Sequence, residues 1–450
     1  MSHRSEPCQS ITADAAPKPM SPLAGLFSDA ARYRWLIFLV LSGGYVLVYF
    51  HRLCPAVVAV DMMADLKAGG ALLGLLGSAY FYPYALMQLP AGLLADSWGA
   101  RRTITLFSLI AFAGALLLAV APNVTLAIVG RALVGLGVSM LFVPTMKVLT
   151  EWFSPRQFAS MTGILLAMGG VGSLFSSAPL AMLTGWLGWR FAFVVVACLT
   201  LILSGLVWSI VRDKPADLGW QAPHDQRPAS ATSAAEPGAL WRGVKTVLGE
   251  PRFWPLACWF FFLSAVFFSF GGLWGGPYLQ HIHGLERTQA GQVLSMLAVG
   301  LIFGAPLQGA LSNRCFKGRK PVLILASVVT TLITALLTCS DASLPLPALY
   351  LICLLFGAFT SASVVVGFSA AKELFPSQIS GTAIGLINLF PFAGGAVFQP
   401  VLGWVLERNG RGVDEAFTIV GYQSAFAVLL GCAVVALVAS LFVKETMDKG

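Results

Sequence analysis

Long apolar segments follow one another along most of this 450-residue chain, separated by short polar connections. About 20 apolar residues are enough for a helix to cross a bilayer. The segments lack the two-residue alternation of membrane β-strands, so each is predicted to be a helix. The first half has six of them, at 35–60, 72–95, 103–121, 124–149, 159–183 and 188–211. The second half has six more, at 253–279, 288–312, 321–339, 345–370, 379–406 and 419–443.

This pattern predicts an all-α polytopic membrane protein with twelve transmembrane helices in two pseudo-symmetric six-helix bundles. A polar stretch rich in Ser, Ala and Pro separates the bundles and has the composition of a flexible linker. Its end, at 240–248, has the amphipathic pattern of a short interfacial helix. We expect an N-terminal tail at 1–34, a first bundle at 35–211, the linker at 212–252, a second bundle at 253–443 and a C-terminal tail at 444–450.

Two polar hairpins, about half the sequence apart, have nearly the same pattern. Each follows a long apolar segment, opens with glycine, has Asp or Asn four residues later and ends with a basic pair. The first reads Gly92-Leu-Leu-Ala-Asp96-Ser-Trp-Gly99-Ala-Arg101-Arg102. The second reads Gly309-Ala-Leu-Ser-Asn313-Arg314-Cys-Phe-Lys317-Gly318-Arg319-Lys320. A repeated hairpin between apolar helices indicates a duplicated bundle, and duplicated membrane bundles mostly move solutes.

Composition and charge support the membrane interpretation. The chain is 57% hydrophobic and only 11% charged, and its mean hydropathy is +0.80, whereas a soluble protein of this size exposes far more charge. The net charge of +8 does not indicate nucleic-acid binding, because the basic residues are scattered over short loops. A lipid bilayer is the expected partner, and a monomer is the expected unit.

The distribution of Lys and Arg predicts the orientation. Twenty of the 28 Lys and Arg residues fall on the side of the N-terminus and the linker, and three fall inside spans. Only five fall on the other side: Lys67, Arg190, Arg287, Arg408 and Arg411. Because basic loops stay in the cytoplasm, both termini are expected there. The location is the plasma membrane, or the inner membrane of a bacterium.

These features resemble the major facilitator superfamily over residues 33–445. The hairpins are similar to its loops between helices 2 and 3 and between helices 8 and 9. Arg131-Ala-Leu-Val-Gly135-Leu-Gly137 is similar to its fourth-helix signature. The resemblance implies solute transport by alternating access.

The resemblance also implies a conformational latch in the first hairpin. Ser97 and Ala100 depart from the family pattern, which usually has basic residues there, and Asn313 replaces the second acid. The second latch is therefore expected to be weaker. The implied latch residues are Gly92, Asp96, Gly99, Arg101 and Arg102.

Arg52 is the main candidate for substrate binding. A basic side chain in the hydrocarbon costs roughly 2.5–3.5 kcal/mol on insertion scales, and an anionic substrate can supply its missing counter-charge. Tyr45 and Tyr49 share its helix face by their spacing, and a guanidinium suits a carboxylate. The segment Tyr49-Phe-His-Arg52 resembles the first helix of the organic anion symporter branch. The alternative is an arginine that reaches the outer interface.

Three further basic residues are candidates for coupling or structure. His51 can carry a coupling proton, because imidazole titrates near neutral pH, or can be a hydrogen-bonded helix residue. The anion symporters usually have an acid there, and another where this chain has Val138. Arg131 serves in coupling or in packing between helices. Lys147 is four residues from Glu151, and a structural pair is favoured over a substrate contact.

Polar and aromatic residues inside the predicted spans are further candidates. They either line a solute cavity or hold helices together, since membrane cores use the same residue types for both. The candidates for the substrate site are Tyr80, Tyr84, Trp274, Asn388 and Gln399.

The sequence thus favours a secondary transporter for a small carboxylate-bearing anion, taken up with protons. Alternatives are a transporter of amino acids or short peptides, a drug or metabolite exporter, and a transporter-like sensor. No metalloprotease, nucleotide-loop or hydrolase motif is present, so we expect no enzyme activity, no cofactor and no metal site.

Overall fold

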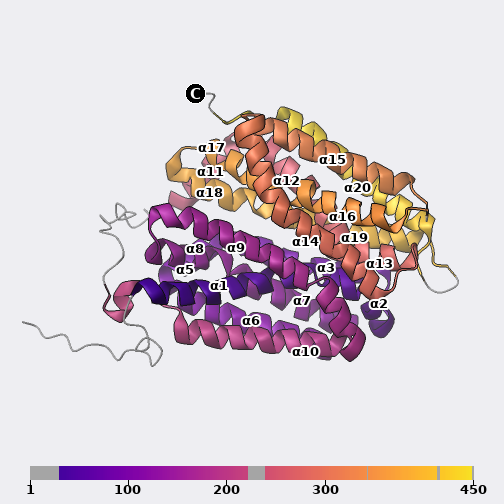
Figure 1. Ribbon diagram of the computed structural model, residues 1–450, viewed down its shortest axis with the longest axis horizontal. Coiled ribbons are helices and arrows are strands. Elements are labelled where there is room, and N and C mark those ends of the chain that lie inside the picture. The colour runs from indigo at the N-terminus through magenta and orange to yellow at the C-terminus, as the bar shows by residue number, and fades with distance from the viewer. Residues whose placement is uncertain (1–29, 221–238, 342, 413–415, 448–450) are drawn as a thin grey trace, which may run out of the picture.

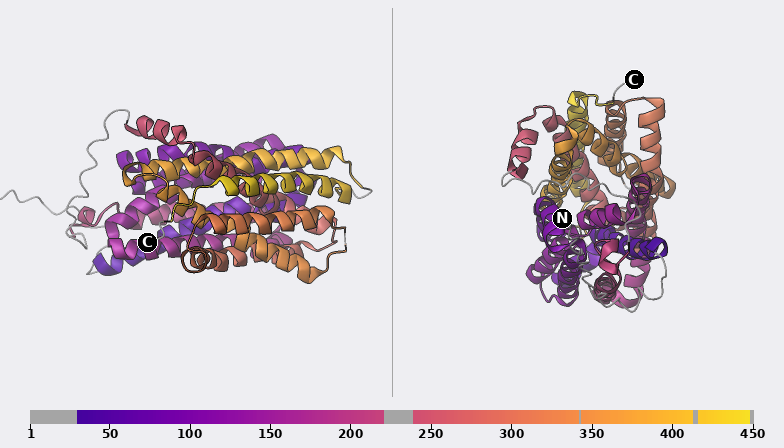
Figure 2. Two further views of the ribbon diagram at one scale, coloured as in Figure 1. Left: turned by 90° about the horizontal axis from the view of Figure 1, so that it is seen from above. Right: turned by 90° about the vertical axis from the view of Figure 1, so that its left-hand side faces the viewer.

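The computed structural model describes residues 30–220, 239–341, 343–412 and 416–447, and these fold into helices packed side by side (Figure 1). The helices run along the long axis of the molecule (Figure 2). Most of the expected N-terminal tail, the centre of the expected linker and the last three residues lie outside the described part.

Helices of the first half and of the second half form two groups that lie one above the other in Figure 1. The first half contains α1 (Ala30–Leu53), α2 (Pro55–Leu66), α3 (Gly70–Ser78), α4 (Phe81–Leu86), α5 (Gln88–Trp98), α6 (Ala100–Val120), α7 (Val124–Ser139), α8 (Phe142–Trp152), α9 (Pro155–Phe175) and α10 (Ala178–Ile210). The linker contains η2 (Pro215–Leu218) and α11 (Ala239–Gly249).

The second half has the same plan, with three short stretches of wider π-helix. It contains α12 (Phe253–Ser269), η3 (Phe270–Trp274), α13 (Gly275–His281), α14 (Arg287–Ala310), η4 (Leu311–Cys315), α15 (Lys320–Cys339), α16 (Leu346–Leu355), η5 (Phe356–Ser361), α17 (Val364–Glu373), α18 (Ser377–Ile387), α19 (Leu389–Arg408) and α20 (Ile419–Phe442).

Ten described helices are long and apolar enough to span a membrane, and an eleventh span is bent by 60° between 70–86 and 90–98. One of the ten, at 160–210, has 51 residues, far more than a bilayer needs. Gly188 divides it, because its φ of 76° is not helical. The segments on either side therefore count as two spans, in agreement with the twelve predicted segments.

Proline marks a break between the first two helices. The helix α1 ends at Leu53, and Pro55 opens α2 at a position where its missing N–H costs nothing. The chain stays continuous, since the Cys54 amide still donates to the Phe50 carbonyl at 3.0 Å. Arg52, just before the break, lies at the contact between the two halves.

We call the end of the molecule with both hairpins and α11 the linker end, and the end with α2 and α13 the distal end. Contacts between the halves concentrate toward the distal end, where α2 and α3 meet α13, η3 and α19. Asp61 forms an ion pair with Arg287 across the halves. The amide of Ala71 donates to the Glu407 carboxylate at 3.2 Å. The structure is therefore closed at the distal end.

Glycine allows this close approach. A methyl group on Gly276 would collide with the carbonyl oxygen of Ala56, and one on Gly403 would collide with that of Gly70. Small residues at such crossings let backbones pack without intervening side chains. The distal closure thus depends on backbone packing as well as on charge.

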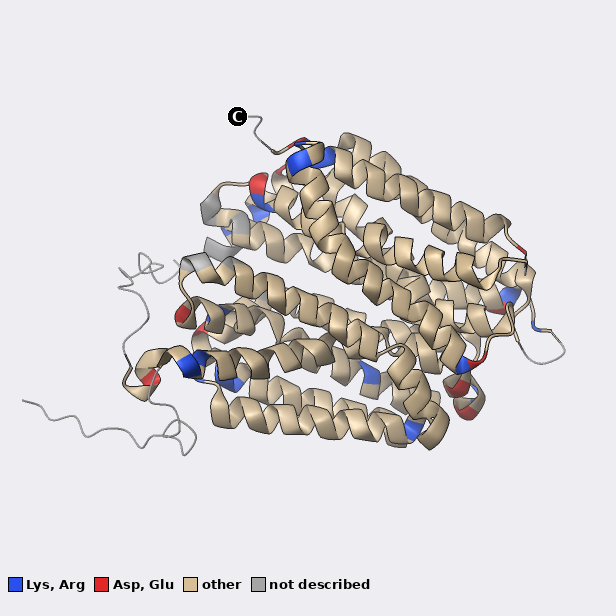
Figure 3. Cartoon of the chain, in the orientation of Figure 1, with Lys and Arg blue, Asp and Glu red and all other residues tan. Residues whose placement is uncertain are grey.

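The linker helix α11 was expected at the membrane interface, and it packs against protein. Val244 and Val247 are buried in an apolar cluster of the second half that includes Phe253 and Phe375. Figure 1 shows α11 beside α18. Most charged residues gather at the two ends of the molecule, and the broad belt between them has few charges (Figure 3).

Candidate functional site

Arg52 lies in the last turn of α1, just before Pro55 opens α2, at the contact between the halves. Its side chain is buried, with 6% of the residue exposed, so the alternative of an arginine reaching the outer interface is wrong. Its Nη2 donates to the Tyr84 hydroxyl at 3.1 Å. No carboxylate in the described ranges pairs with it, and its Nε has no hydrogen-bond partner there.

Aromatic rings surround the Arg52 guanidinium instead. Its central carbon lies 4.5 Å from the ring centroid of Tyr49 and 5.2 Å from that of Tyr84. The second half supplies Phe392 at 4.9 Å and Phe268 at 5.9 Å. Cation–π contacts offset part of the cost of burying the charge, though less than an anion would.

Of the two tyrosines expected beside Arg52, only Tyr49 contacts it. The Tyr45 ring packs edge-on against Tyr49, with centroids 5.3 Å apart, and against Phe142 at 5.4 Å. The phenol that bonds Arg52 belongs to Tyr84, on a different helix. The helix spacing predicted a shared face, and the packing of α4 decided which phenol reaches the guanidinium.

His51 and Arg131 form a second buried basic group next to Arg52. His51 is fully buried, and neither ring nitrogen has a hydrogen-bond partner among the described residues. The structure therefore does not support the hydrogen-bonded alternative. Arg131 on α7 donates to the Cys54 Sγ at 3.9 Å and lies 5.0 Å from the Tyr80 ring. Its Nε and Nη2 are also without partners in the described part.

Tyr80 connects the two basic groups. Its ring stacks on that of Tyr84 with centroids 5.5 Å apart, and its hydroxyl donates to the Val48 carbonyl at 3.5 Å. Arg52 and Arg131 therefore lie against two stacked rings of the same helix region. An anion that enters here meets two guanidinium groups and the imidazole of His51.

The three candidates from the second half have different hydrogen-bond partners. Asn388 donates to the Gln88 side chain of the first half at 2.8 Å. Gln399 donates to the Phe268 carbonyl at 2.8 Å, and its Oε1 is unpartnered among the described atoms. Trp274 is fully buried and donates to the Gln399 carbonyl at 3.0 Å. Trp274 is thus a core residue and does not contact Arg52.

Lys147 is paired, but with a different partner from the one expected. Its ammonium bonds Asp96 of the first hairpin at 2.7 Å and the Ala95 carbonyl at 2.9 Å. The i, i+4 pair with Glu151 is not the contact seen, because the hairpin brings Asp96 closer. This bond links the hairpin to the middle of α8.

The remaining hairpin residues differ in role. Gly99 has a φ of 85°, which a residue with a side chain rarely adopts. The Arg101 side chain bonds the Trp208 carbonyl and covers its ring at 4.2 Å. Arg102 is exposed, and Gly92 has room for a side chain.

Two acids were missed by sequence reasoning. Asp213 accepts from the Arg101 amide at 2.7 Å, at the start of α6. Glu445 accepts from the Arg319 amide at 2.8 Å and the Lys320 amide at 3.1 Å, at the start of α15. The sequence does contain a signal for both: each half ends with valine, a basic residue and an acid, as Val211-Arg212-Asp213 and Val443-Lys444-Glu445.

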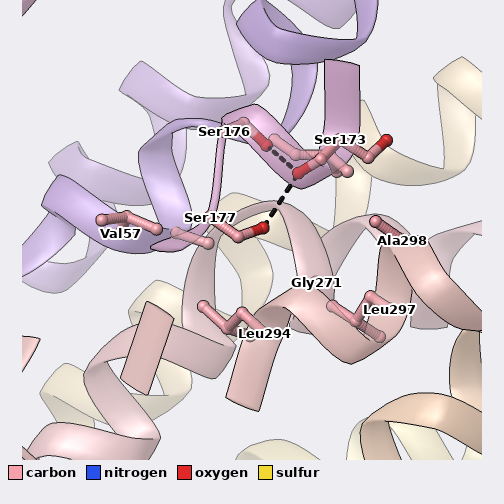
Figure 4. A pocket seen from close by; sticks show the side chains of 10 residues that line it. Val57, Ser173, Ser176, Ser177, Gly271, Leu294, Leu297 and Ala298 are labelled. Atoms are coloured by element: carbon pink, nitrogen blue, oxygen red, sulfur yellow. Dashed lines mark hydrogen bonds between the residues drawn. The ribbon is translucent and has the colours of Figure 1, made fainter. Parts of the chain in front are cut away.

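A small pocket lies between the halves in this state. It lies beside Leu53 and is bordered by Ser173, Ser176 and Ser177 of the first half and by Gly271 and Leu294 of the second (Figure 4). Its volume of about 10 Å³ is about that of one water. Substrate entry therefore requires the halves to move apart.

Comparisons with known proteins agree with this architecture. A probable sulfoacetate transporter of Cupriavidus necator is 25% identical over 92% of this chain and 94% of its own. A hexuronate transporter of Bacillus subtilis is 27% identical over 85% and 82%. The crystal structure of a D-xylose-proton symporter superimposes with a TM-score of 0.73 at 15% identity, covering 93% and 98%.

The model of the family described as the Major Facilitator Superfamily matches residues 41–390 and 274–449. Together these matches include nearly the whole of both halves. With its repeated helices and hairpins, the chain belongs to the major facilitator superfamily, whose members are secondary transporters and not enzymes.

Proposed function

We propose that this protein carries a small carboxylate-bearing organic anion across the membrane in symport with protons. The halves rock around a central site, so that the site faces one side of the membrane at a time. Arg52 binds the carboxylate, while Tyr49, Tyr84 and Tyr80 shape the site around it. Tyr45, Asn388 and Gln399 hold the surrounding helices.

The buried Arg52 is the observation that carries this proposal. It lies where the two halves meet, and no acid in the described part of the chain neutralises it. A buried charge without a counter-ion is costly, and a carboxylate that forms two hydrogen bonds with a guanidinium removes that cost. The same absence disfavours amino acids and peptides, whose ammonium group needs an acid.

His51 is the group to which we assign proton coupling. A proton on this imidazole, next to Arg131, becomes favourable when an anion enters and offsets the positive charge. When the anion leaves on the opposite side of the membrane, the His51 imidazole loses its proton more readily. The positive charge of Arg131, next to His51, affects how readily the imidazole gains and loses this proton.

We place the linker end and both termini in the cytoplasm of a bacterial cell, with the protein in the inner membrane as a monomer. The excess of Lys and Arg at that end supports this orientation. The closed distal end then faces the outside. The similar proteins named as sulfoacetate and hexuronate transporters both carry anions, which supports an anionic cargo.

Uptake into proteoliposomes tests the proposal. Labelled phthalate and glucuronate are offered under an inward proton gradient with the voltage held at zero. We expect Arg52→Ala to lower uptake by about 30-fold or more, since removing one partner of a buried charge pair costs at least about 2 kcal/mol. Arg52→Lys should restore little, because lysine lacks the planar fork.

Arg408→Ala is the matched control, since Arg408 is exposed at the distal end over Trp404. Equal uptake by Arg52→Ala and the control would overturn the anion site. If uptake by the unaltered protein is the same with and without the gradient, proton symport is wrong. If His51→Gln abolishes the response of uptake to the proton gradient and the control Arg408→Ala does not, the assignment to His51 stands.

A further inference from the structure

The wall that faces Arg52 from the second half is aromatic. Phe268 on α12 and Phe392 on α19 both lie within 6 Å of the guanidinium carbon. Their rings stack on each other, with centroids 5.9 Å apart and planes 18° apart. Phe392 also packs on the Tyr84 ring at 4.3 Å, so rings from both halves enclose one charge.

The aromatic wall extends beyond these two rings. Phe81 of the first half lies 5.0 Å from Phe268 and 6.3 Å from Phe392. All three phenylalanines are buried. The wall thus crosses from one half to the other, and separating the halves exposes flat apolar faces directly opposite Arg52.

Few polar groups next to this wall are available for hydroxyl groups. The amides of Asn388 and Gln399 already donate to Gln88 and to the Phe268 carbonyl. On the side of the second half, the atoms left without partners next to this wall, among the described residues, are the Ser269 hydroxyl and the Gln399 Oε1, while the unpartnered nitrogens of Arg52, His51 and Arg131 belong to the first half. A sugar acid with four or more hydroxyls would leave several of them without partners, and each such loss weakens binding.

We infer that the preferred cargo is a carboxylate with a flat aromatic body, and that Phe268 and Phe392 select it. This inference rests on the proposed function, because it requires Arg52 to bind the carboxylate. The carboxylate takes the place at the guanidinium that the rings of the second half occupy in this state. The body then stacks on Phe268 and Phe392, so that one ligand joins both halves.

The stacking also gives a reason for closure around the cargo. Arg52 belongs to the first half and the two phenylalanines belong to the second. A ligand that contacts only Arg52 does not favour approach of the halves, whereas one that also stacks on the wall does. Aromatic rings prefer such offset or edge contacts at centroid distances of about 4.5–7 Å, the range found here among Phe268, Phe392 and Phe81.

Calorimetric binding to the purified full chain in lipid nanodiscs tests the inference without interference from membrane permeation. Benzoate, cyclohexanecarboxylate and glucuronate are compared at neutral pH, where all three are ionised. We expect benzoate to bind about tenfold or more tightly than glucuronate, within the roughly 100-fold that an apolar pocket achieves against hydroxyl groups. Cyclohexanecarboxylate should fall between them.

Variants assign the selection to the wall. Phe392→Leu should weaken benzoate about fivefold, the scale of one aromatic contact, and leave glucuronate unchanged. Phe392→Tyr keeps the ring and should retain the preference, which guards against a variant that merely folds poorly. Phe303→Leu is the control, since Phe303 is 71% exposed on the outer surface of α14.

The outcomes separate the two claims. Glucuronate binding that is tighter than benzoate binding, and that disappears in Arg52→Ala, would overturn the aromatic selection and leave the anion transporter standing. Equal loss of all three ligands in Phe392→Leu, with Phe392→Tyr equally impaired, would also overturn it. If none of the ligands binds in an Arg52-dependent way, the proposed function itself fails.

Discussion

The two hairpins have similar sequences but opposite charge arrangements. In the first, the hairpin supplies the acid Asp96 and the middle of α8 supplies the base Lys147, 2.7 Å apart. In the second, the hairpin supplies the base Arg319 and the end of α17 supplies the acid Glu373, 2.8 Å apart. Duplication preserved a bond between a hairpin and a neighbouring helix while the sign of each partner changed.

The second pair is also the better supported. The side chains of Arg319 and Glu373 are 14% and 31% exposed, against 33% and 74% for Lys147 and Asp96. Arg319 further donates to the Asn313 side chain at 2.6 Å. Asn313 is therefore an acceptor for this arginine, and the expectation of a weaker second hairpin does not hold for the contacts seen in this state.

What the hairpins share is the way their following helix begins. Asp213 and Glu445 each follow the last helix of their half. Their carboxylates accept hydrogen bonds from backbone amides at the start of α6 and of α15, respectively. A carboxylate at a helix N-terminus satisfies unpaired N–H groups and interacts favourably with the helix dipole. The shared caps hold each hairpin in place, and the charge pairs distinguish the two.

Breaking the second pair should have the largest effect on stability. Arg319→Ala leaves Glu373 half-buried with only Thr446 as a side-chain partner among those described. We expect the free energy of unfolding to fall by about 2 kcal/mol, the scale of a hydrogen bond to a charged group. The thermal midpoint measured in detergent should be clearly lower. Lys147→Ala should lower the midpoint less, because its pair is more exposed.

The control for this comparison is Arg314→Ala in the same hairpin, since Arg314 is exposed. Its midpoint should match that of the unaltered protein. A drop for Lys147→Ala equal to that for Arg319→Ala would show that burial does not rank the two pairs.

The second prediction concerns transport rate, where the first hairpin should dominate. Asp96→Asn removes the carboxylate that joins the hairpin to α8, whereas Asn313→Ala removes one neutral acceptor and leaves the Arg319 pair intact. We expect uptake to fall about fivefold for Asp96→Asn, the equivalent of about 1 kcal/mol, and less than twofold for Asn313→Ala.

A charge exchange sharpens that prediction. The double variant with Asp96→Lys and Lys147→Asp gives the first hairpin the polarity of the second, and it should recover most of the lost rate. Equal rates for Asp96→Asn and Asn313→Ala, measured at equal protein levels in proteoliposomes, would remove the claimed asymmetry.

Local patterns explain what could be predicted from the sequence. The helices and the hairpins follow from apolar runs and repeated letters. Arg52 could be singled out because a charge inside an apolar run is costly wherever the run lies. These are properties of one segment, and they do not depend on which segment packs beside it.

The partners of these residues depend on packing between segments, so the sequence could not supply them. Arg52 bonds Tyr84, 32 residues further along the chain, and faces Phe392 in the other half. Lys147 bonds Asp96, 51 residues away, although Glu151 was nearer in sequence. Two candidates on one helix face are a reasonable prediction, but the neighbouring helix decides the contact.

The smallest expected effect concerns Glu445 and depends on pH. Burial acts to raise the pKa of its carboxyl, but amides of Arg319, Met447, Lys320 and Thr446 donate to it and hold the pKa below its usual value. A carboxyl whose pKa is lower in the folded protein adds stability above its unfolded pKa of about 4.3. That stability disappears as the pH falls through the folded pKa.

Glu445→Gln should therefore lower the free energy of unfolding at neutral pH by less than about 1 kcal/mol, the scale of a partly exposed charge at a helix N-terminus, and the thermal midpoint should fall slightly. The difference from the unaltered protein should shrink below about pH 4, where the native carboxyl also gains its proton. Glu286→Gln, an exposed acid at the distal end, should show no such dependence. A difference that persists unchanged to low pH would mean that shape at the start of α15, and not the charge of Glu445, accounts for the effect.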